Sequence, residues 1–139
     1  MIIVPDASVV LKWLLPTEDE PYFEAALALR QQIETSAVDH FLAPALLFFE
    51  VGNTLGRLVP DHAGLLLNSC FDLIRQYPVP GDYLDTALSL TRRYPVQFYD
   101  ATYHALALSV GGEMVTADQR YLKAVDGHAG IIAIQDWLG

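Results

Sequence analysis

Near its start the chain reads Ile2-Ile3-Val4-Pro5-Asp6-Ala7-Ser8-Val9-Val10-Leu11-Lys12-Trp13. The three β-branched residues that open this stretch are typical of a strand buried on both faces. Pro5 and Asp6 end the strand, and the apolar residues after them predict a helix over residues 7–15, which Pro16 ends. The stretch therefore predicts a β-strand that passes through an acidic residue directly into an α-helix.

Short apolar runs and longer helical patterns alternate along the rest of the chain. Further strands are predicted at residues 41–43, 113–116 and 131–134, with a weaker candidate around Val79 between two prolines. Helices are predicted at residues 21–35, 44–59, 62–76, 82–93, 99–110 and 119–125. Thr17 and Glu20 have the spacing of a capping box before the first of these helices. The alternation indicates an α/β sandwich with a mostly parallel sheet.

The length and composition of the chain predict one folded domain. With 139 residues and no repeat, low-complexity tract or long linker, the domain is predicted to span residues 1–139. Hydrophobic residues make up 53% and charged residues 18%, so we expect a buried core rather than a disordered chain. The 8 basic and 17 acidic residues give a net charge of −9, which excludes a uniformly basic nucleic-acid-binding surface but not a local basic strip.

Three further features concern the compartment. The single cysteine, Cys70, excludes an internal disulfide framework and a cysteine-rich zinc site, and it fits a reducing environment. No apolar run approaches the roughly 18 residues that a membrane span needs. No basic stretch precedes Pro5, so the start of the chain does not have the pattern of a secretory signal. These features predict a cytoplasmic protein.

Four acidic residues stand at positions that composition alone does not explain. Asp6 and Asp118 each come just after a predicted strand, Asp100 opens a predicted helix, and Glu50 interrupts an apolar run. Each has a simpler explanation. The three aspartates have the positions of helix N-caps, and Glu50 belongs to a polar helical face that is solvated in many proteins. That face also carries Asn53, Thr54 and Arg57.

The predicted topology favours a shared site for these acids. In an open parallel sheet, ligands bind beyond the carboxyl ends of the strands, where the strand order reverses. If the strands before Asp6 and Asp118 are neighbours there, both carboxylates face one crevice, which Glu50 and Asp100 can join from adjacent helices. Clustered carboxylates repel one another unless a cation neutralises them, and an all-oxygen set suits Mg²⁺ or Mn²⁺. His104 lacks a second histidine four residues on, so we expect a packing or surface residue rather than a zinc ligand.

Four segments of the chain, at residues 4–13, 49–55, 99–107 and 115–122, read VPDASVVLKW, FEVGNTL, YDATYHALA and VTADQRYL. Together they resemble the PIN-domain ribonucleases, and more closely the VapC-type toxins of bacterial and archaeal toxin–antitoxin pairs. The segments follow the family's order at its usual intervals, so the resemblance spans nearly the whole chain. One departure is Pro5, where the family usually has an apolar residue with a backbone N–H.

The resemblance implies a three-layer α/β/α sandwich with a mostly parallel sheet of about five strands. It implies that the family's acidic catalytic positions are occupied here by Asp6, Glu50, Asp100 and Asp118. It places beside them two hydroxyls and one amide, those of Ser8, Thr116 and Asn53. The implied activity is Mg²⁺- or Mn²⁺-dependent cleavage of single-stranded RNA, often in tRNA or ribosomal RNA, leaving a 5′-phosphate and a 3′-hydroxyl. Members are commonly homodimers, and a small cognate antitoxin protein silences them.

We expect the three aspartates to hold one cation directly or through water, with Glu50 completing the set or positioning a second ion. Water would be the nucleophile, so neither a histidine base nor a serine nucleophile is required. Ser8 and Thr116 are interpreted as donors that orient carboxylates or water, with capping as the alternative.

Few basic residues are available to contact RNA phosphates. Arg120, two residues after Asp118, and Lys12 are the main candidates. Weaker candidates are Arg92, Arg93 and Lys123. With so few cations we expect weak non-specific binding and selection of RNA by its shape.

Two other functions stay open at this point. Aspartyl-phosphate chemistry, as in phosphatases, needs a second aspartate two residues after the first, and this chain has Ser8 there. A non-catalytic module would bind RNA or protein on the same fold, although clustered carboxylates without a function are electrostatically costly. The apolar helices at residues 46–59 and 65–74 are expected to fill the core, with a dimer or antitoxin surface as the alternative.

Overall fold

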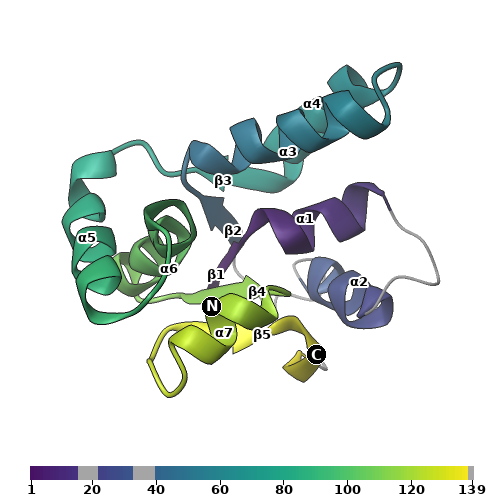
Figure 1. The fold of residues 1–139 in the computed structure, drawn as a ribbon. Helices are drawn as coiled ribbons and strands as arrows, with labels where there is room; N and C mark the ends of the chain where they lie inside the picture. The colour runs from purple at the N-terminus through teal and green to yellow at the C-terminus, as the bar shows by residue number, and fades with distance from the viewer. Residues whose placement is uncertain (16–21, 33–39, 138–139) are drawn as a thin grey trace.

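The computed structural model describes residues 1–15, 22–32 and 40–137, and its centre is a parallel β-sheet (Figure 1). The strands are β1 (Ile2–Pro5), β2 (His40–Ala43), β3 (Ile74–Gln76), β4 (Glu113–Thr116) and β5 (Ile131–Ala133). They are arranged in the order β3-β2-β1-β4-β5, and each neighbouring pair runs parallel. The predicted α/β class and the five-stranded sheet are therefore confirmed.

Helices cover both faces of this sheet. They are α1 (Ala7–Leu14), α2 (Phe23–Gln31), α3 (Leu46–Leu58), α4 (Ala63–Leu73), α5 (Leu84–Arg93), α6 (Phe98–Val110) and α7 (Gln119–Ala124). Two short 3₁₀ turns, η1 (Pro80–Asp82) and η2 (Ile134–Asp136), complete the described elements. Figure 1 shows α1 and α2 on one side of the sheet and α5 and α6 on the other, while α3 and α4 form a hairpin beside it. This is the three-layer arrangement that the resemblance implied.

The central strand and one helix form most of the core. Ile3 and Val4 of β1 are fully buried, as their β-branched side chains predict for a strand with a layer on each face. Helix α6 is buried over the continuous stretch from Ala101 to Ala107 because α5 covers the side that the sheet does not. The start of α6 is therefore held firmly against the sheet, close to the carboxyl end of β1.

The strand order reverses at β1. The chain runs from β1 outward to β2 and β3, then returns across the sheet to pair β4 with the other side of β1. In parallel sheets this reversal opens a crevice at the carboxyl ends of the two central strands. The condition set by the sequence, that the strands before Asp6 and Asp118 are neighbours, is met.

Two predicted elements differ from the structure. The helix predicted to reach residue 76 ends at Leu73, and Ile74–Gln76 form β3 instead. Ile74 continues the apolar pattern of α4, so periodicity alone does not mark the change; its pairing with Phe41 of β2 decides it. The strand candidate around Val79 was wrong, since Val79 is 48% exposed and immediately precedes η1.

The other boundaries agree to within the usual one or two residues, except that α2 ends at Gln31 rather than near residue 35. Ile134 belongs to η2 rather than to the last strand, and η1 replaces the predicted start of α5. The predicted capping box of Thr17 and Glu20 lies outside the described residues, as do residues 33–35 of the helix predicted at residues 21–35. None of the helices in the described ranges has the length and apolar character needed to cross a membrane.

Candidate active site at the carboxyl ends of β1 and β4

Asp6 links β1 to α1 and to β4. Its backbone N–H donates to the carbonyl oxygen of Val115 at 3.1 Å, which extends the pairing of β1 and β4 by one residue. Its side chain caps α1, because Oδ1 accepts the backbone N–H of Val9 at 3.2 Å. The carboxylate is only 8% exposed. Asp6 is thus a helix N-cap, the simpler of the two explanations given for it above. It is also a buried acid at the point where the strand order reverses. Pro5, which lacks an N–H, is accommodated in β1 opposite Val115.

Two hydroxyls connect this carboxylate to the loop after β4. Ser8 Oγ donates to Asp6 Oδ1 at 2.5 Å and accepts the backbone N–H of Ala117 at 3.0 Å. Thr116 Oγ1 donates to Asp6 Oδ2 and accepts the backbone N–H of Asp118 at 2.9 Å. Both oxygens of Asp6 therefore receive hydroxyl donors, and both hydroxyls are oriented by the backbone of the neighbouring strand end.

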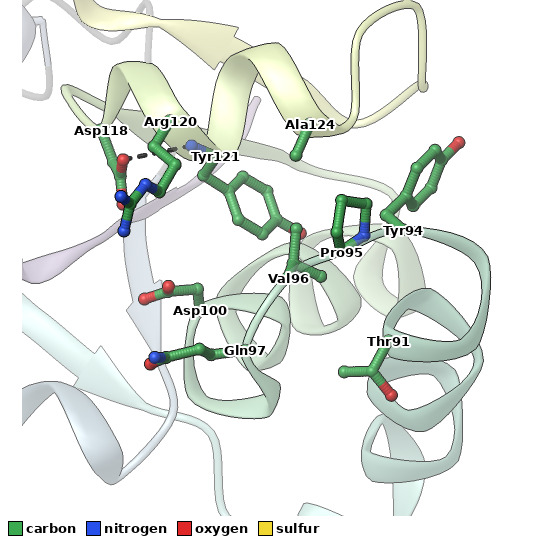
Figure 2. Close-up of a pocket in the computed structure, with 10 residues that line it drawn as sticks. All are labelled: Thr91, Tyr94, Pro95, Val96, Gln97, Asp100, Asp118, Arg120, Tyr121 and Ala124. Atoms are coloured by element: carbon green, nitrogen blue, oxygen red, sulfur yellow. Dashed lines mark hydrogen bonds between the residues drawn. The ribbon is translucent and has the colours of Figure 1, made fainter.

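Asp118 and Asp100 face each other from two helix starts. Asp118 caps α7, because its Oδ1 accepts the backbone N–H of Tyr121 at 3.1 Å, and Figure 2 draws this bond as a dashed line. Asp100 lies in the first turn of α6. In Figure 2 both carboxylates lie on the same side of a pocket, with the side chains of Arg120 and Gln97 beside them.

Glu50 reaches the site from α3. The phenol of Tyr103, which is only 2% exposed, donates a hydrogen bond to Glu50 Oε1. Tyr103 follows Asp100 by three residues, so the two side chains project from the same face of α6. Asn53, one turn after Glu50, is exposed.

Burial and mutual repulsion shift the pKa values of these groups. Burial raises the pKa of Asp6 from 3.8 to about 6, with the nearby charge of Asp118 adding to the rise, although the bonds from Ser8, Thr116 and Val9 oppose it. The pKa of the Asp100 carboxyl is also raised, first by burial and then by the charges of Asp118 and Glu50. Each of the four acids is therefore electrostatically coupled to at least one other member of the set.

These residues fit a hard divalent cation in their chemistry. All four side chains offer carboxylate oxygen, the ligand type that Mg²⁺ and Mn²⁺ prefer, and the ionised forms of two of them are disfavoured without a positive charge. Within the three described stretches, no three histidine, cysteine, aspartate or glutamate side chains already form a group that could hold a metal ion. A cation bound here would therefore keep water among its ligands, as Mg²⁺ usually does, or draw the carboxylates together.

A pocket of about 680 Å³ opens beside Asp100 and Asp118. Its walls come from the end of α5, the connection between α5 and α6, the first turn of α6, and α7. Figure 2 shows a polar end, where the acids lie, and an apolar end lined by residues such as Pro95, Val96 and Ala124. Asp6 and Glu50 are not among its lining residues.

The remaining sequence candidates lie at different distances from this centre. Arg120 is exposed and lines the pocket, whereas Lys12 lies half-buried on α1 and does not line it.

His104 is fully buried, with Nδ1 2.9 Å from the Tyr121 hydroxyl and Nε2 2.7 Å from the carbonyl oxygen of Ala129. Because that carbonyl only accepts, Nε2 donates to it and Nδ1 accepts from Tyr121. His104 thus joins α6 to α7 and is a packing residue.

Sequence reasoning missed Tyr103 as a partner of Glu50. The sequence does show that Tyr103 follows Asp100 by three residues on one helix. The acid that accepts its hydrogen bond, however, is Glu50, 53 positions earlier in the chain. Only the packing of α3 beside α6 brings the two together.

Comparison with known proteins places this architecture in a family. Residues 3–127 match the family model of the PIN domain. A protein of Pyrobaculum aerophilum named Ribonuclease VapC3 is 30% identical in an alignment of 128 positions that covers 86% of this chain and 92% of that protein. The chain belongs to the PIN-domain family, as a VapC-type member.

Solved structures of other proteins share this fold. A toxin–antitoxin complex from Klebsiella pneumoniae contains a chain that matches with a TM-score of 0.71 at 14% identity, over 95% of this chain and 97% of that one. Mycobacterium tuberculosis VapC20, described as a toxin that cleaves the sarcin–ricin loop, matches with a TM-score of 0.61 at 16% identity, over 89% and 97% of the two chains. The PIN fold is therefore retained where sequence identity is low.

Proposed function

We propose that this VapC-type PIN protein is a divalent-metal-dependent endoribonuclease, the toxin of a toxin–antitoxin pair. The name of the Pyrobaculum relative, Ribonuclease VapC3, supports hydrolysis of RNA. The observation that carries the proposal is the group of acids at the switch point. The hydroxyl of Thr116 donates to the Asp6 carboxylate and accepts the backbone N–H of Asp118. The charges of Asp118 and Glu50 raise the pKa of Asp100, so these acids lie close to one another as well.

Each residue has a role that follows from its contacts. Asp6, Asp100 and Asp118 supply carboxylate oxygens to a cation, and Glu50, held by Tyr103, completes the set or helps to hold a second ion. Mg²⁺ or Mn²⁺, when bound, activates water and offsets the charge that develops on the phosphodiester. Ser8 and Thr116 keep both oxygens of Asp6 in fixed directions, and Asn53 presents its amide to solvent on the same helix as Glu50.

The hydrolysis requires no nucleophilic side chain from the protein. Ser8 cannot serve as one, because its hydroxyl already donates to Asp6 and accepts from Ala117. His104 cannot serve as a base, because both of its ring nitrogens are engaged and its side chain is buried. The chain's contribution is thus to place carboxylates, and water is the group that attacks phosphorus. Arg120, beside Asp118, contacts a phosphate of the RNA, and Lys12 is a second candidate for such a contact.

A protein partner has a surface available on the hairpin of α3 and α4. One face of α3 is in the core, where Leu47, Val51 and Leu55 are fully buried. The same hairpin also exposes large apolar side chains, namely Phe49, Leu58, Leu65 and Phe71. Exposed apolar groups gathered on one hairpin are typical of protein-binding surfaces. We assign this surface to a cognate antitoxin or to the second copy of a homodimer.

Cleavage of a defined single-stranded RNA tests the proposal. The purified protein should cleave with Mg²⁺ or Mn²⁺, lose activity in chelator, and regain it when the metal is added back. Asp118→Asn should abolish cleavage, whereas Asp72→Asn, a matched change of an exposed acid on α4, should leave it unchanged. Metal-independent cleavage, or full activity in Asp118→Asn, would overturn the proposal. RNA binding with no cleavage under any of these conditions would favour the non-catalytic module.

A further inference from the structure

The pocket beside Asp100 and Asp118 continues well past the acids. About 680 Å³ is within the roughly 300–1,000 Å³ of small-molecule sites, and far exceeds what a hydrated cation fills. The acids occupy one end only. A pocket of this size next to a phosphodiester-cleaving centre has room for a further part of the substrate.

The two ends of this pocket differ in chemistry. At the polar end, Arg120 is the one cation among the described residues that line the pocket. Gln97, the residue before α6, makes no side-chain cap to the helix, and its amide lies toward the same side as the carboxylates (Figure 2). In the part of the chain that the structure describes, this amide has no hydrogen-bond partner. The polar end therefore offers a guanidinium and an unused amide to an anionic, hydrogen-bonding group.

The far end is lined mainly by apolar groups, although Thr91, whose hydroxyl is bonded to the Leu88 carbonyl oxygen, and Tyr94 also border it. Pro95 and Val96 come from the connection between α5 and α6, and in Figure 2 they lie between the rings of Tyr121 and Tyr94. Ala124, at the end of α7, closes this part with a methyl group. Tyr121 is only 2% exposed and its hydroxyl is bonded to His104, so it forms a fixed wall. This end is suited to a flat, weakly polar group.

We propose that this pocket is a subsite for one unpaired nucleotide of the RNA, next to the bond that is cut. The sugar and phosphate lie at the polar end against Arg120 and Gln97, and the base enters the apolar end between Val96 and Ala124. A base can enter only if it is out of a helix, so the subsite selects single-stranded or looped RNA. This inference rests on the proposed function, and it explains how a chain with net charge −9 recognises RNA with few cations.

The rate of cleavage of an RNA that lacks one base tests the proposed subsite. Wild-type protein should cleave an RNA with an abasic nucleotide beside the cut bond about tenfold more slowly than the intact RNA, as expected when one base contact is lost. Ala124→Leu, which fills the apolar end, should slow cleavage of the intact RNA by a similar factor. If base and leucine compete for one space, Ala124→Leu should add no further loss on the abasic RNA. Two losses that multiply would overturn the subsite.

Binding without catalysis provides the second test. The four nucleoside 5′-monophosphates and ribose 5-phosphate are titrated into the wild-type protein, and the NMR signals of the Gln97 amide and the Ala124 methyl are followed. We expect at least one nucleotide to bind about tenfold more tightly than ribose 5-phosphate and to shift both signals. Ala124→Leu should remove that preference. Gln97→Ala should weaken nucleotide and ribose 5-phosphate equally, and Gln76→Ala, a matched change on β3, should alter neither.

The outcomes separate the two proposals. Equal binding of ribose 5-phosphate and every nucleotide, or shifts at neither residue, would overturn the subsite whatever the activity of the protein. Nucleotide binding with the expected shifts supports the subsite even in chelator. Cleavage that survives in chelator would instead overturn the metal-dependent mechanism.

Discussion

The two halves of the candidate site are held in different ways. Asp6 and Asp118 lie at strand ends, where two hydroxyls and two backbone N–H groups connect β1 to the loop after β4. Glu50 and Asp100 come from helices α3 and α6. Glu50 receives one hydrogen bond, from Tyr103, and the Asp100 carboxylate has no hydrogen-bond partner in the described part of the chain.

This difference indicates which half of the site is arranged by folding alone, before any cation binds. The strand-end half is set as soon as β1 and β4 pair, because its hydrogen bonds follow the register of the strands. In the helix-borne half the backbone is fixed by packing, but the Glu50 and Asp100 carboxylates receive fewer hydrogen bonds than that of Asp6, so we expect them to adjust more readily to a cation. We therefore expect substitutions in the strand-end half to be the more damaging.

Asp6→Asn should have the largest effect. It removes the carboxylate that the hydroxyls of Ser8 and Thr116 orient. The rate of cleavage should therefore fall by more than ~100-fold, which is the upper limit when only a residue supporting a metal ligand is lost. The fold should be retained, since asparagine still caps helices well. Initial rates at saturating Mg²⁺, together with circular dichroism, measure the two effects. Asp72→Asn provides the control, and cleavage within tenfold of wild type would contradict the role of Asp6.

The pH dependence of stability should single out Asp6. Its pKa in the folded protein, about 6, lies above the ordinary 3.8, so the folded state binds more protons than the unfolded state between these values. Stability in chelator should therefore fall as the pH rises from 4 to 6, and then level off. The full decrease due to this residue is about 3 kcal/mol.

Urea unfolding in chelator at pH 4 to 8 measures this decrease. The difference between wild type and Asp6→Asn isolates the residue, because the variant cannot ionise there and should be the more stable above pH 6. Saturating Mg²⁺ should remove most of the difference by favouring the ionised carboxylate in wild type. A difference that is constant across the range would show that Asp6 titrates normally.

Thr116→Val should have the next largest effect on cleavage. The hydroxyl of Thr116 donates to Asp6 and accepts the N–H of Asp118, and the side chain is fully buried. Losing it should weaken metal-dependent cleavage by about 10- to 100-fold and destabilise the protein by about 1–3 kcal/mol, because a backbone N–H loses its acceptor. Thr116→Ser keeps the hydroxyl and should retain most activity. Equal loss in both variants would point to packing instead.

Tyr103→Phe should have the smallest effect. The ring stays in the core, and only the hydrogen bond to Glu50 is lost. We expect about a tenfold or smaller loss of cleavage, seen mainly as a higher Mg²⁺ requirement. Tyr99→Phe on the same helix, where the side chain is 61% exposed, is the matched control. An effect as large as that of Asp6→Asn would show that the two halves are equally essential.

Elements with a strong local pattern were predictable from the sequence. The β-branched run of β1, the strand before Asp118 and the long apolar helices have signatures within a few residues. Edge strand β3 has no such signature, because Arg75 and Gln76 are exposed and only Ile74 is buried. Its strand character comes from pairing with β2, some 30 residues earlier, a contact that no local pattern encodes.

The same division applies to the site. The acids stood out because an aspartate directly after a buried strand, or a glutamate inside an apolar run, is chemically conspicuous. Hydroxyl donors that orient carboxylates were also expected at Ser8 and Thr116, and both hydroxyls donate to Asp6. The Tyr103–Glu50 bond and the pocket next to Asp100 could not be derived, since each brings together residues of different elements.

By itself, then, the sequence determined the strand–acid–helix units at Asp6 and Asp118, because short-range sterics, capping and burial preferences act between near neighbours. Only the tertiary structure decided that β1 and β4 lie side by side, that α3 and α6 bring Glu50 to Asp100, and that a pocket opens beside them. The physical reason is that strand pairing and helix packing depend on contacts between distant segments, whose geometry exists only after the chain has closed on its core.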